Sequence, residues 1–321
     1  MSGNVNTTIN GSQPSICYKP TAEKIGKTFA FCLIFLVSLA GNIVIGIIVY
    51  KTKTMRKPIN FLIVNMAMSD LLYLIFVIPR EIQMLYLDSW LIGGPLGQAL
   101  CKLVVFLPHV SALVSIQSLV LIAVDRFGAV VVPLRSPLVS SKQCPFFILA
   151  TWIVAMAIKS PYLFAMKLVE HAAGLKYRMQ RNKVFGGTLS LEYYFVSFSI
   201  LFIFIPFVLI GILYIIIFLK LKSQKIPGER SAEAEVEQRR QREQKVLKMS
   251  IAIVLGFAIC WLPFVIMYSL FYFASNIMMP CDFQYFYSFA LLMVSSNCAI
   301  NPCICFIFSS NYREGLKSLL R

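Results

Sequence analysis

The stretch that decides the fold runs from residue 103 to residue 126 and reads LVVFLPHVSALVSIQSLVLIAVDR. It carries no formal charge, apart from any proton on His109, until Asp125 and Arg126 arrive together at its end. A membrane-spanning helix needs about 20 mostly apolar residues, so this stretch is long enough to cross a bilayer. Ionisable residues in such a segment are expensive to desolvate and usually serve function. The alternative is a helix end whose long arginine side chain reaches back into water.

The composition of the chain is that of an integral membrane protein. Hydrophobic residues make up 58% of the 321 residues and charged residues 14%, which excludes an ordinary soluble domain. Seven apolar stretches are long enough to span a bilayer. They lie at about 28–50, 59–86, 98–131, 145–166, 190–221, 245–275 and 284–308. The sequence therefore predicts a single all-α membrane domain, a seven-transmembrane helix bundle over residues 28–308.

The amino-terminal segment and the distribution of basic residues indicate the orientation of the chain in the plasma membrane. Residues 1–27 lack the apolar core of a cleavable signal peptide, and they hold glycosylation sequons at Asn6 and Asn10 that are usable only outside the cytosol. Basic residues favour the cytoplasmic side. In the connections after spans one, three and five they are Lys51, Lys53, Arg56, Lys57, Arg135, Lys142 and a cluster from Lys220 to Lys248. We therefore expect an extracellular amino end and a cytoplasmic amphipathic helix over residues 309–321.

Each predicted span contains one polar or helix-breaking signature. A polar group in hydrocarbon must find a partner within the protein, and a proline removes a backbone hydrogen bond and favours a kink. In chain order the signatures are Asn42, Asp70, Asp125-Arg126-Phe127, Trp152, Pro206, Trp261-Leu262-Pro263 and Asn301-Pro302. In this order and spacing the chain resembles the rhodopsin-like, or class A, G-protein-coupled receptors. The runs 55–72 and 245–264 are most similar to those of neuropeptide receptors.

The resemblance implies a signalling switch at the inner end of the bundle. Arg126 is expected to pair with Asp125 at rest, and Glu243 to be either a second acidic partner or a solvated charge. Activation would swing the inner end of the sixth span outward and free Arg126 for a heterotrimeric G protein. A ligand can drive this change only by binding the active state more tightly. The other switch positions are Tyr214, Pro133 and Leu134, and the hinge positions are Phe257, Trp261, Pro263 and Pro302.

Two positions depart from the pattern of this family. Cys305 stands where the family usually has a tyrosine, three residues after the Asn301-Pro302 pair. That tyrosine normally helps to hold the active arrangement together with the tyrosine that Tyr214 matches. This polar bridge is therefore not expected here. Phe127 replaces the usual tyrosine after Arg126, which is a milder change.

The family pattern also implies an ion site in the middle of the bundle. Positions that line a sodium site in the family are matched here by Asp70, Ser115, Asn297 and Asn301. A buried carboxylate with hydroxyl and amide oxygens suits a hard cation. The alternative is a protonated Asp70 within a hydrogen-bonded polar cluster. No cofactor is expected apart from this allosteric ion.

The cysteines expected on the outer side are Cys17, Cys101 and Cys281. The second outer loop of the family usually supplies a partner for Cys101, but no cysteine lies between Cys144 and Cys260. Connectivity cannot be deduced from sequence alone. Some receptors of the family link the amino-terminal segment to the third outer loop, which favours a Cys17–Cys281 disulfide and a free Cys101. A Cys17–Cys101 disulfide is the alternative.

The class of ligand is narrowed by exclusion. The seventh span has Ser295 where retinal would need a lysine, and the third span has Pro108 where amine receptors have a carboxylate. The expected pocket wall consists of Arg80, Glu81, His109, Lys159, Tyr268, Tyr272, Gln284 and Tyr285. Aromatic and mixed charged side chains favour a peptide. The basic second outer loop either attracts an acidic group on this ligand or only keeps the loop soluble. An anionic lipid or a nucleotide is the alternative ligand.

Other classes of function have less support in the sequence. Coupled transporters often show internal repeats, but no repeat is visible, and an odd number of spans argues against a doubled fold. No group of His, Asp and Glu in the spans suggests a metal or a nucleophile, so no enzymatic activity is expected. The net charge of +16 is explained by contact with an anionic inner leaflet. The expected partners are an extracellular ligand, a heterotrimeric G protein and membrane lipids, but no nucleic acid.

Overall fold

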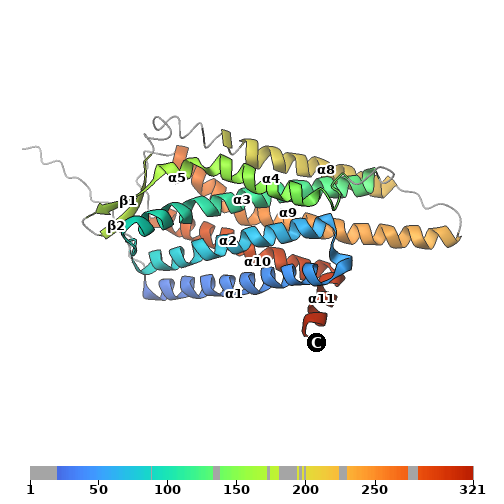
Figure 1. The fold of residues 1–321 in the computed structure, drawn as a ribbon, viewed down its shortest axis with the longest axis horizontal. Coiled ribbons are helices and arrows are strands. Elements are labelled where there is room, and N and C mark those ends of the chain that lie inside the picture. The colour runs from blue at the N-terminus through green and yellow to red at the C-terminus, as the bar shows by residue number, and fades with distance from the viewer. Residues whose placement is uncertain are drawn as a thin grey trace, which may run out of the picture.

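A computed structural model of the chain describes residues 20–87, 89–132, 138–171, 174–180, 194, 197–198, 200–223, 230–273 and 281–320. In this part of the chain seven helical spans are long and apolar enough to cross a membrane. Their main helices are α1 (Thr21–Lys51), α2 (Pro58–Tyr86), α3 (Gly94–Val131), α4 (Cys144–Lys159), α8 (Ile205–Ser223), α9 (Arg230–Phe273) and α10 (Cys281–Phe308). They run lengthwise beside one another (Figure 1), which confirms the predicted seven-transmembrane bundle.

Several helix bounds differ from the predicted spans. Helix α1 begins at Thr21, before the predicted start at residue 28. Helix α9 begins at Arg230 and extends past the end of the bundle (Figure 1), because residues 230–248 are rich in the strong helix formers Ala, Glu, Gln, Lys and Arg. Short elements complete the description: η1 (Lys53–Met55), α5 (Pro161–Ala165), the π-helical turn η2 (Ile200–Phe204) and α11 (Ser310–Leu320).

A β-hairpin that the sequence did not predict covers one end of the bundle (Figure 1). Its antiparallel strands are β1 (Met166–His171) and β2 (Gly174–Met179). Gly174 has a φ of +108°, a conformation that side chains with a Cβ rarely adopt. Gln98 of α3 fixes the hairpin by accepting a 2.8 Å hydrogen bond from the backbone N–H of Leu168. The hairpin is therefore held directly over the start of α3.

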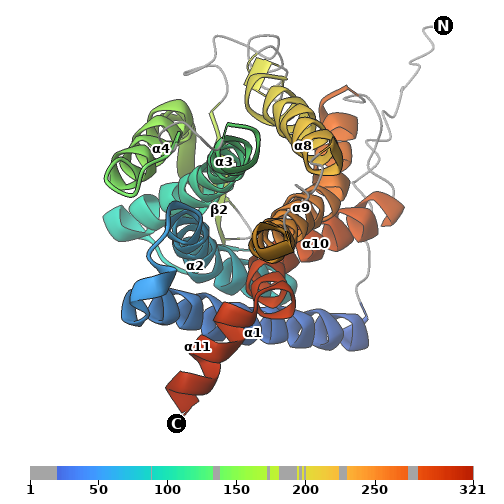
Figure 2. The same cartoon turned by 90° about the vertical axis from the view of Figure 1, so that its right-hand side faces the viewer.

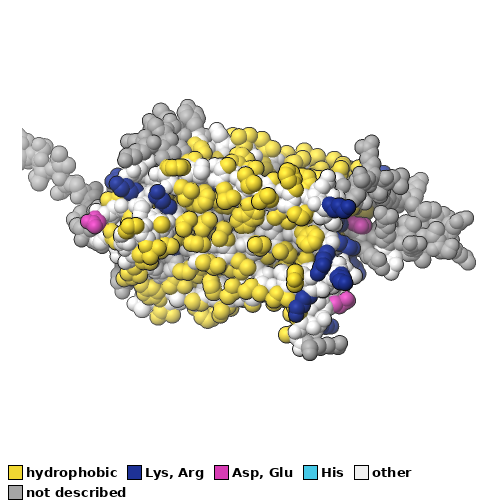
Figure 3. Space-filling view, in the orientation of Figure 1, with side chains coloured by type: hydrophobic (Ala, Val, Ile, Leu, Met, Phe, Trp, Pro, Cys, Tyr) yellow, Lys and Arg dark blue, Asp and Glu magenta, His cyan; other side chains and the backbone are white. Residues whose placement is uncertain are grey.

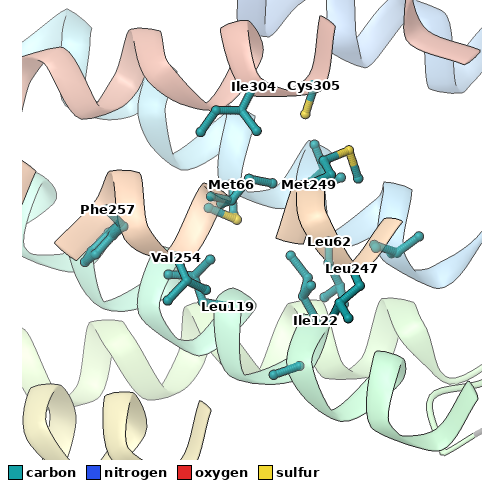
Figure 4. Close-up of a cluster of buried hydrophobic side chains, with 14 of the residues drawn as sticks. Leu62, Met66, Leu119, Ile122, Leu247, Met249, Val254, Phe257, Ile304 and Cys305 are labelled. Atoms are coloured by element: carbon teal, nitrogen blue, oxygen red, sulfur yellow. The ribbon is translucent and has the colours of Figure 1, made fainter. Parts of the chain in front are cut away.

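Helix α3 lies between its neighbours α2, α4 and α8 when the bundle is viewed from one end (Figure 2). The largest buried cluster occupies the half of the bundle away from the hairpin. Figure 4 shows part of it, with Leu119 and Ile122 of α3 next to side chains of α2, α9 and α10. Gly41 of α1 permits a close approach to α10, because a Cβ there would lie 2.6 Å from Cβ of Pro302.

The outer surface of the bundle is apolar over most of its length. Figure 3 shows hydrophobic side chains covering the visible face of the helices, with Lys and Arg side chains gathered near the ends. Large side chains such as Leu36, Ile153 and Phe218 are more than half exposed. An exposed apolar belt of this kind suits contact with lipid tails, since backbone polar groups are satisfied within the helices.

Helix α11 lies across the end of the bundle opposite the hairpin (Figures 1 and 2) and confirms the predicted short carboxyl-terminal helix. Its Tyr312 is 1% exposed, and the phenol donates a 3.2 Å hydrogen bond to Oδ1 of Asn60. Asn60 in turn donates to the backbone oxygen of Met55 at 2.7 Å. Arg313 binds the free carbonyl oxygens at the end of α10, those of Phe306 and Ile307. These contacts fix α11 against the start of α2, the adjacent turn η1 and the end of α10.

We expect Tyr312→Phe to destabilise the protein by about 1 kcal/mol, because the ring packing remains while the buried amide oxygen of Asn60 loses its donor. A change of that size lowers the melting temperature by about 2–4 °C. Thermal unfolding of the purified protein in detergent measures it. Tyr285→Phe is the control, since Tyr285 is 48% exposed. An unchanged melting temperature for Tyr312→Phe would mean that the hydrogen bond does not hold α11.

Candidate functional site

A cavity of about 510 Å³ opens between the helices in the half of the bundle next to the hairpin. This volume lies within the range of about 300–1,000 Å³ that is typical of ligand pockets. Helices α2, α3, α4, α5, α8, α9 and α10, the turn η2 and the start of β1 all contribute to its wall. The lining is mostly apolar and aromatic, so its few polar groups determine what it can bind.

The first polar group in the wall is an ion pair on α2. Nη1 of Arg80 lies 2.7 Å from Oε1 of Glu81. The side chains of Arg80 and Glu81 are 17% and 9% exposed. Because the two charges cancel, this pair gives the cavity a dipole and no net charge.

The second polar group combines side chains of α3, α4 and α5. Lys159, the last residue of α4, is 2% exposed, and its Nζ lies 3.1 Å from the ring centroid of Phe198. His109 stacks on Tyr162 with a centroid separation of 4.5 Å. Nδ1 of His109 lies 2.6 Å from the backbone oxygen of Val105. A carbonyl oxygen only accepts hydrogen bonds, so Nδ1 carries the proton and leaves Nε2 as an acceptor in the neutral ring.

The cavity also contacts a stack of aromatic rings on α9. Phe257 and Trp261 lie one turn apart, with ring centroids 5.5 Å apart and an interplanar angle of 16°. Trp261 also contacts Phe264 edge-on at 5.9 Å. Pro263 lies within this segment of α9, where it removes a backbone hydrogen bond. A ligand in the cavity would therefore contact α9 next to the position at which Pro263 removes a backbone hydrogen bond.

The structure places some, but not all, of the expected pocket residues at the cavity wall. Arg80, Glu81, His109 and Lys159 line it. The side chains of Tyr268 and Tyr272 lie outside the described residues. Gln284 and Tyr285 are not part of the described wall. Further lining residues that sequence reasoning missed are Tyr73, Tyr162, Phe198, Tyr287, Leu291 and Val294.

The face of α10 that lines the cavity could have been predicted from the spacing of its residues. Tyr287, Leu291 and Val294 are separated by four and then three residues, which places them on one face of a helix. Tyr285 lies on another face, is 48% exposed and has the ammonium of Lys27 5.9 Å from its ring centroid. The choice of Tyr285 thus differs from the observed wall by a rotation of the helix, whereas Gln284 shares the face of Tyr287 and Leu291 but lies nearer the start of α10, outside the described wall.

A buried polar cluster around Asp70 joins α2, α3 and α10 in the middle of the bundle. Asp70 is 2% exposed and accepts a 3.0 Å hydrogen bond from Nδ2 of Asn301. The hydroxyl oxygens of Ser69 and Ser115 are 2.8 Å apart. Oδ1 of Asn297 and Oδ1 of Asn301 are buried without a hydrogen-bond partner among the described residues. The carboxylate and the two unsatisfied amide oxygens are ligands that fit a hard cation.

Arg126 connects α3 to α9 at the end of the bundle opposite the hairpin. Its Nη2 lies 2.5 Å and its Nε 3.1 Å from Oδ2 of Asp125. Its Nη1 lies 3.3 Å from Oε2 of Glu243. Arg126 and Asp125 are 13% and 8% exposed, and Glu243 is 28% exposed. Glu243 therefore contacts Arg126 in this structure and is not merely a solvated charge.

The remaining switch positions are only partly described. Tyr214 is 8% exposed and belongs to the same buried cluster as Cys305, which is fully buried (Figure 4). Pro133 and Leu134 lie outside the described residues. Cys305 fills its site as a small apolar side chain next to α9, so no phenol is present at this position of α10.

We expect Glu243→Gln to raise basal nucleotide exchange on the G protein about 1.5- to 5-fold. The pair is partly exposed, and such pairs contribute about 0.2–1 kcal/mol. Its loss favours the open arrangement of α9. Exchange of labelled nucleotide in membranes without ligand measures the effect. Glu237→Gln is the control, because Glu237 lies on the same helix and receives a 3.1 Å hydrogen bond from Gln241. Equal changes in basal exchange for both variants would show that Glu243 acts no differently from another acidic residue of α9.

The extracellular features expected from the sequence fall mainly outside the described residues. Asn6, Asn10, Cys17 and the side chain of Cys281 are in this group, so the glycosylation sites and the Cys17–Cys281 disulfide stay predictions. Cys101 is described, and it is a fully buried free thiol.

Seven apolar spans, a cavity at one end and the ion pairs of Arg126 at the other are the arrangement of a seven-helix membrane receptor. The chain belongs to the family "7 transmembrane receptor (rhodopsin family)", whose family model matches residues 41–304. This finding confirms the family that the sequence signatures indicated.

Three relatives illustrate the breadth of the match. The chain is 30% identical to a QRFP-like peptide receptor of Branchiostoma floridae, over 96% of this chain and 81% of that protein. It is 26% identical to the substance-P receptor of Homo sapiens, over 98% and 76% respectively. It is 31% identical to the RYamide receptor of Drosophila melanogaster, over 89% of this chain and 61% of that protein.

Proposed function

We propose that this receptor binds an extracellular peptide and activates a heterotrimeric G protein. The observation that carries the proposal is the set of relatives, because the three described above are named as receptors for a QRFP-like peptide, for substance P and for RYamide. The cavity supports a peptide as well, since it combines aromatic rings with both signs of charge. A peptide offers complementary groups for each of these features.

The orientation we propose places the hairpin and the cavity outside the cell and Arg126 inside it. Supporting this orientation, the sequons at Asn6 and Asn10 and the segment before α1 would be extracellular. The basic residues around Arg56, Arg313 and Lys317 would face the anionic inner leaflet. The proposed Cys17–Cys281 disulfide would then connect the amino-terminal segment to the start of α10 on the outer side.

Helix α9 can transmit the signal because it takes part in both sites. Trp261 lies at the cavity, and Glu243 binds Arg126 about five turns away on the same helix. Pro263 provides a place at which the two halves of the helix can move relative to each other. A partly exposed ion pair such as Arg126–Glu243 contributes only about 0.2–1 kcal/mol, so a ligand needs little preference for the open state to break this contact.

A sodium ion is the proposed allosteric partner of the Asp70 cluster. Asp70, Ser115, Asn297 and Asn301 would hold it, and the ion would supply a positive charge that balances the buried carboxylate. Without a cation, the carboxylate would have to be protonated to avoid an unbalanced charge in the bundle. The two unsatisfied amide oxygens favour the ion, because a protonated carboxyl can donate to only one of them.

A peptide screen tests the proposed function. Cells that express the receptor would be exposed to a library of synthetic neuropeptides and read out by calcium and by cyclic nucleotides. We expect at least one peptide to evoke a response and to accelerate nucleotide exchange on a G protein in isolated membranes. A response only to lipids or nucleotides would replace the peptide as ligand. If no G protein responds and a labelled solute crosses proteoliposomes, the protein is a transporter.

A further inference from the structure

Lys159 is a buried cation at the cavity wall whose charge has no acidic partner in the described part of the chain. Arg80 is paired with Glu81, and Arg126 with Asp125 and Glu243. The buried carboxyl group of Asp70 accepts a hydrogen bond from Asn301 and is not among the residues that line the cavity. Lys159 is 2% exposed, yet its close partners within the described residues are aromatic rings. Its Nζ lies 3.1 Å from the ring centroid of Phe198 and 5.7 Å from that of Tyr162.

A purely structural role does not account for this placement. A lysine in the last turn of a helix can bind the free carbonyl oxygens there and favours the negative end of the helix dipole. Nζ of Lys159 instead lies over a ring from the segment that precedes α8. A cation–π contact stabilises an ammonium group, but it offsets only part of the free energy lost when the ion leaves water. The ammonium group therefore retains the capacity to bind an anion in the cavity.

The charges around Lys159 indicate which anion fits. Arg80 and Glu81 cancel each other. His109 uses Nδ1 to donate to Val105, and burial beside the ammonium group of Lys159 disfavours a second positive charge, so the ring is counted as neutral. Among the described residues that line the cavity one net positive charge is left, and it matches the single negative charge of a carboxylate. A phosphate group carries about −1.5 to −2 at neutral pH and would be left underneutralised in this apolar setting.

We propose that Lys159 binds a carboxylate of the peptide, which is either its carboxyl terminus or an Asp or Glu side chain. The inference rests on the proposed peptide function and adds a chemical requirement to it. The carboxylate occupies the space beside His109 and Tyr162, where the ammonium group can replace an aromatic contact with a charge-assisted hydrogen bond. The peptide is thereby oriented with its acidic group toward α4 and α5.

Matched peptide sets test this assignment in the full-length receptor. Each activating peptide of the library is made with a free carboxyl terminus, with a terminal amide, and with internal Asp or Glu changed to Asn or Gln. Dose–response curves are measured on the wild type, Lys159→Gln and Lys159→Arg. We expect Lys159→Gln to lower the potency of the carboxylate-bearing form about tenfold. The matched form without that carboxylate should have the same low potency on the wild type and on Lys159→Gln. Comparing the amide form with the Asn or Gln form shows whether Lys159 binds the carboxyl terminus or an acidic side chain.

Two variants separate this role from misfolding and from long-range attraction. Lys159→Arg keeps the charge and should retain the preference for the carboxylate, and surface labelling confirms that each variant reaches the membrane. Lys176→Gln removes a charge from the exposed face of β2 and should change potency less than about threefold, since exposed charges are screened. Equal loss for all peptide forms on Lys159→Gln, or no loss at all, overturns the inference. If the wild type responds to no peptide, the result is a different one, because it refutes the proposed peptide function itself.

Discussion

Arg126→Ala should reduce ligand-stimulated nucleotide exchange about 30-fold or more while leaving peptide affinity nearly unchanged. The reason is that Arg126 contacts Glu243 of α9 in this structure and, in the proposed mechanism, binds the G protein once that pair opens. A buried arginine at a protein interface contributes about 2 kcal/mol or more, which corresponds to roughly a 30-fold change. The cavity residues lie at the other end of the bundle and keep their contacts. Nucleotide exchange and peptide binding, measured in the same membranes, separate the two effects.

Two further variants make the Arg126 result interpretable. Arg126→Lys keeps the positive charge but loses the fork that reaches Asp125 and Glu243 together, so partial signalling is expected. Arg126→Ala also leaves Asp125, which is 8% exposed, without its cation, and the protein is expected to be less stable. Exchange rates must therefore be divided by the amount of receptor at the surface. Normal signalling by Arg126→Ala would show that the ion pair is a structural contact and not a switch.

The two ion pairs of Arg126, with Asp125 and with Glu243, differ in strength. Asp125 directly precedes Arg126 on the same helix and accepts from two of its nitrogens, whereas Glu243 accepts from one at 3.3 Å. The Glu243 contact is the weaker and more exposed of the two, and it is the only one of them that α9 must break to move. We therefore expect the resting state to be held to a modest degree by ion pairing and to a larger degree by packing around Leu119, Ile122 and Met249.

The fold could be predicted from the sequence because membrane spans are long, apolar and separated by charges. The one polar signature in each span also placed Asp70, Arg126 and Trp261 correctly on the helices that hold them. What the sequence did not reveal were features set by contacts between distant segments. The hairpin is fixed by Gln98 and by a backbone bond from Trp90 to Leu175, neither of which leaves a periodic pattern.

The rotation of each helix about its axis was the least predictable quantity. A helix that contacts lipid on one side and protein on the other is apolar all round, so hydrophobicity does not mark its inner face. On α10 this placed the expectation on Tyr285, while Tyr287 lines the cavity. The contact between Tyr312 and Asn60 was missed for a different reason, because only the packing of α11 against the bundle brings these distant residues together.

Asp70→Asn should abolish the response of the receptor to sodium. Ions that bind the resting bundle shift its equilibrium toward the resting state, and allosteric couplings of this kind amount to about 5- to 150-fold. We expect basal nucleotide exchange on the wild type to fall when N-methylglucamine chloride is replaced by sodium chloride at constant ionic strength. The asparagine keeps the shape of the side chain but not the charge, so exchange by Asp70→Asn should be the same in both salts.

Ser115→Ala and Ser118→Ala form a matched pair for this experiment. Both serines are buried on α3, but Ser115 lies in the Asp70 cluster, whereas Ser118 binds Asn65 at 2.9 Å. Sodium sensitivity should weaken in Ser115→Ala and persist in Ser118→Ala. The competing view, a protonated Asp70 in a hydrogen-bonded cluster, predicts instead that the wild type responds equally to both salts. A wild type that is insensitive to sodium would therefore assign Asn297 and Asn301 to hydrogen bonding alone, and Asp70→Asn would then behave like the wild type.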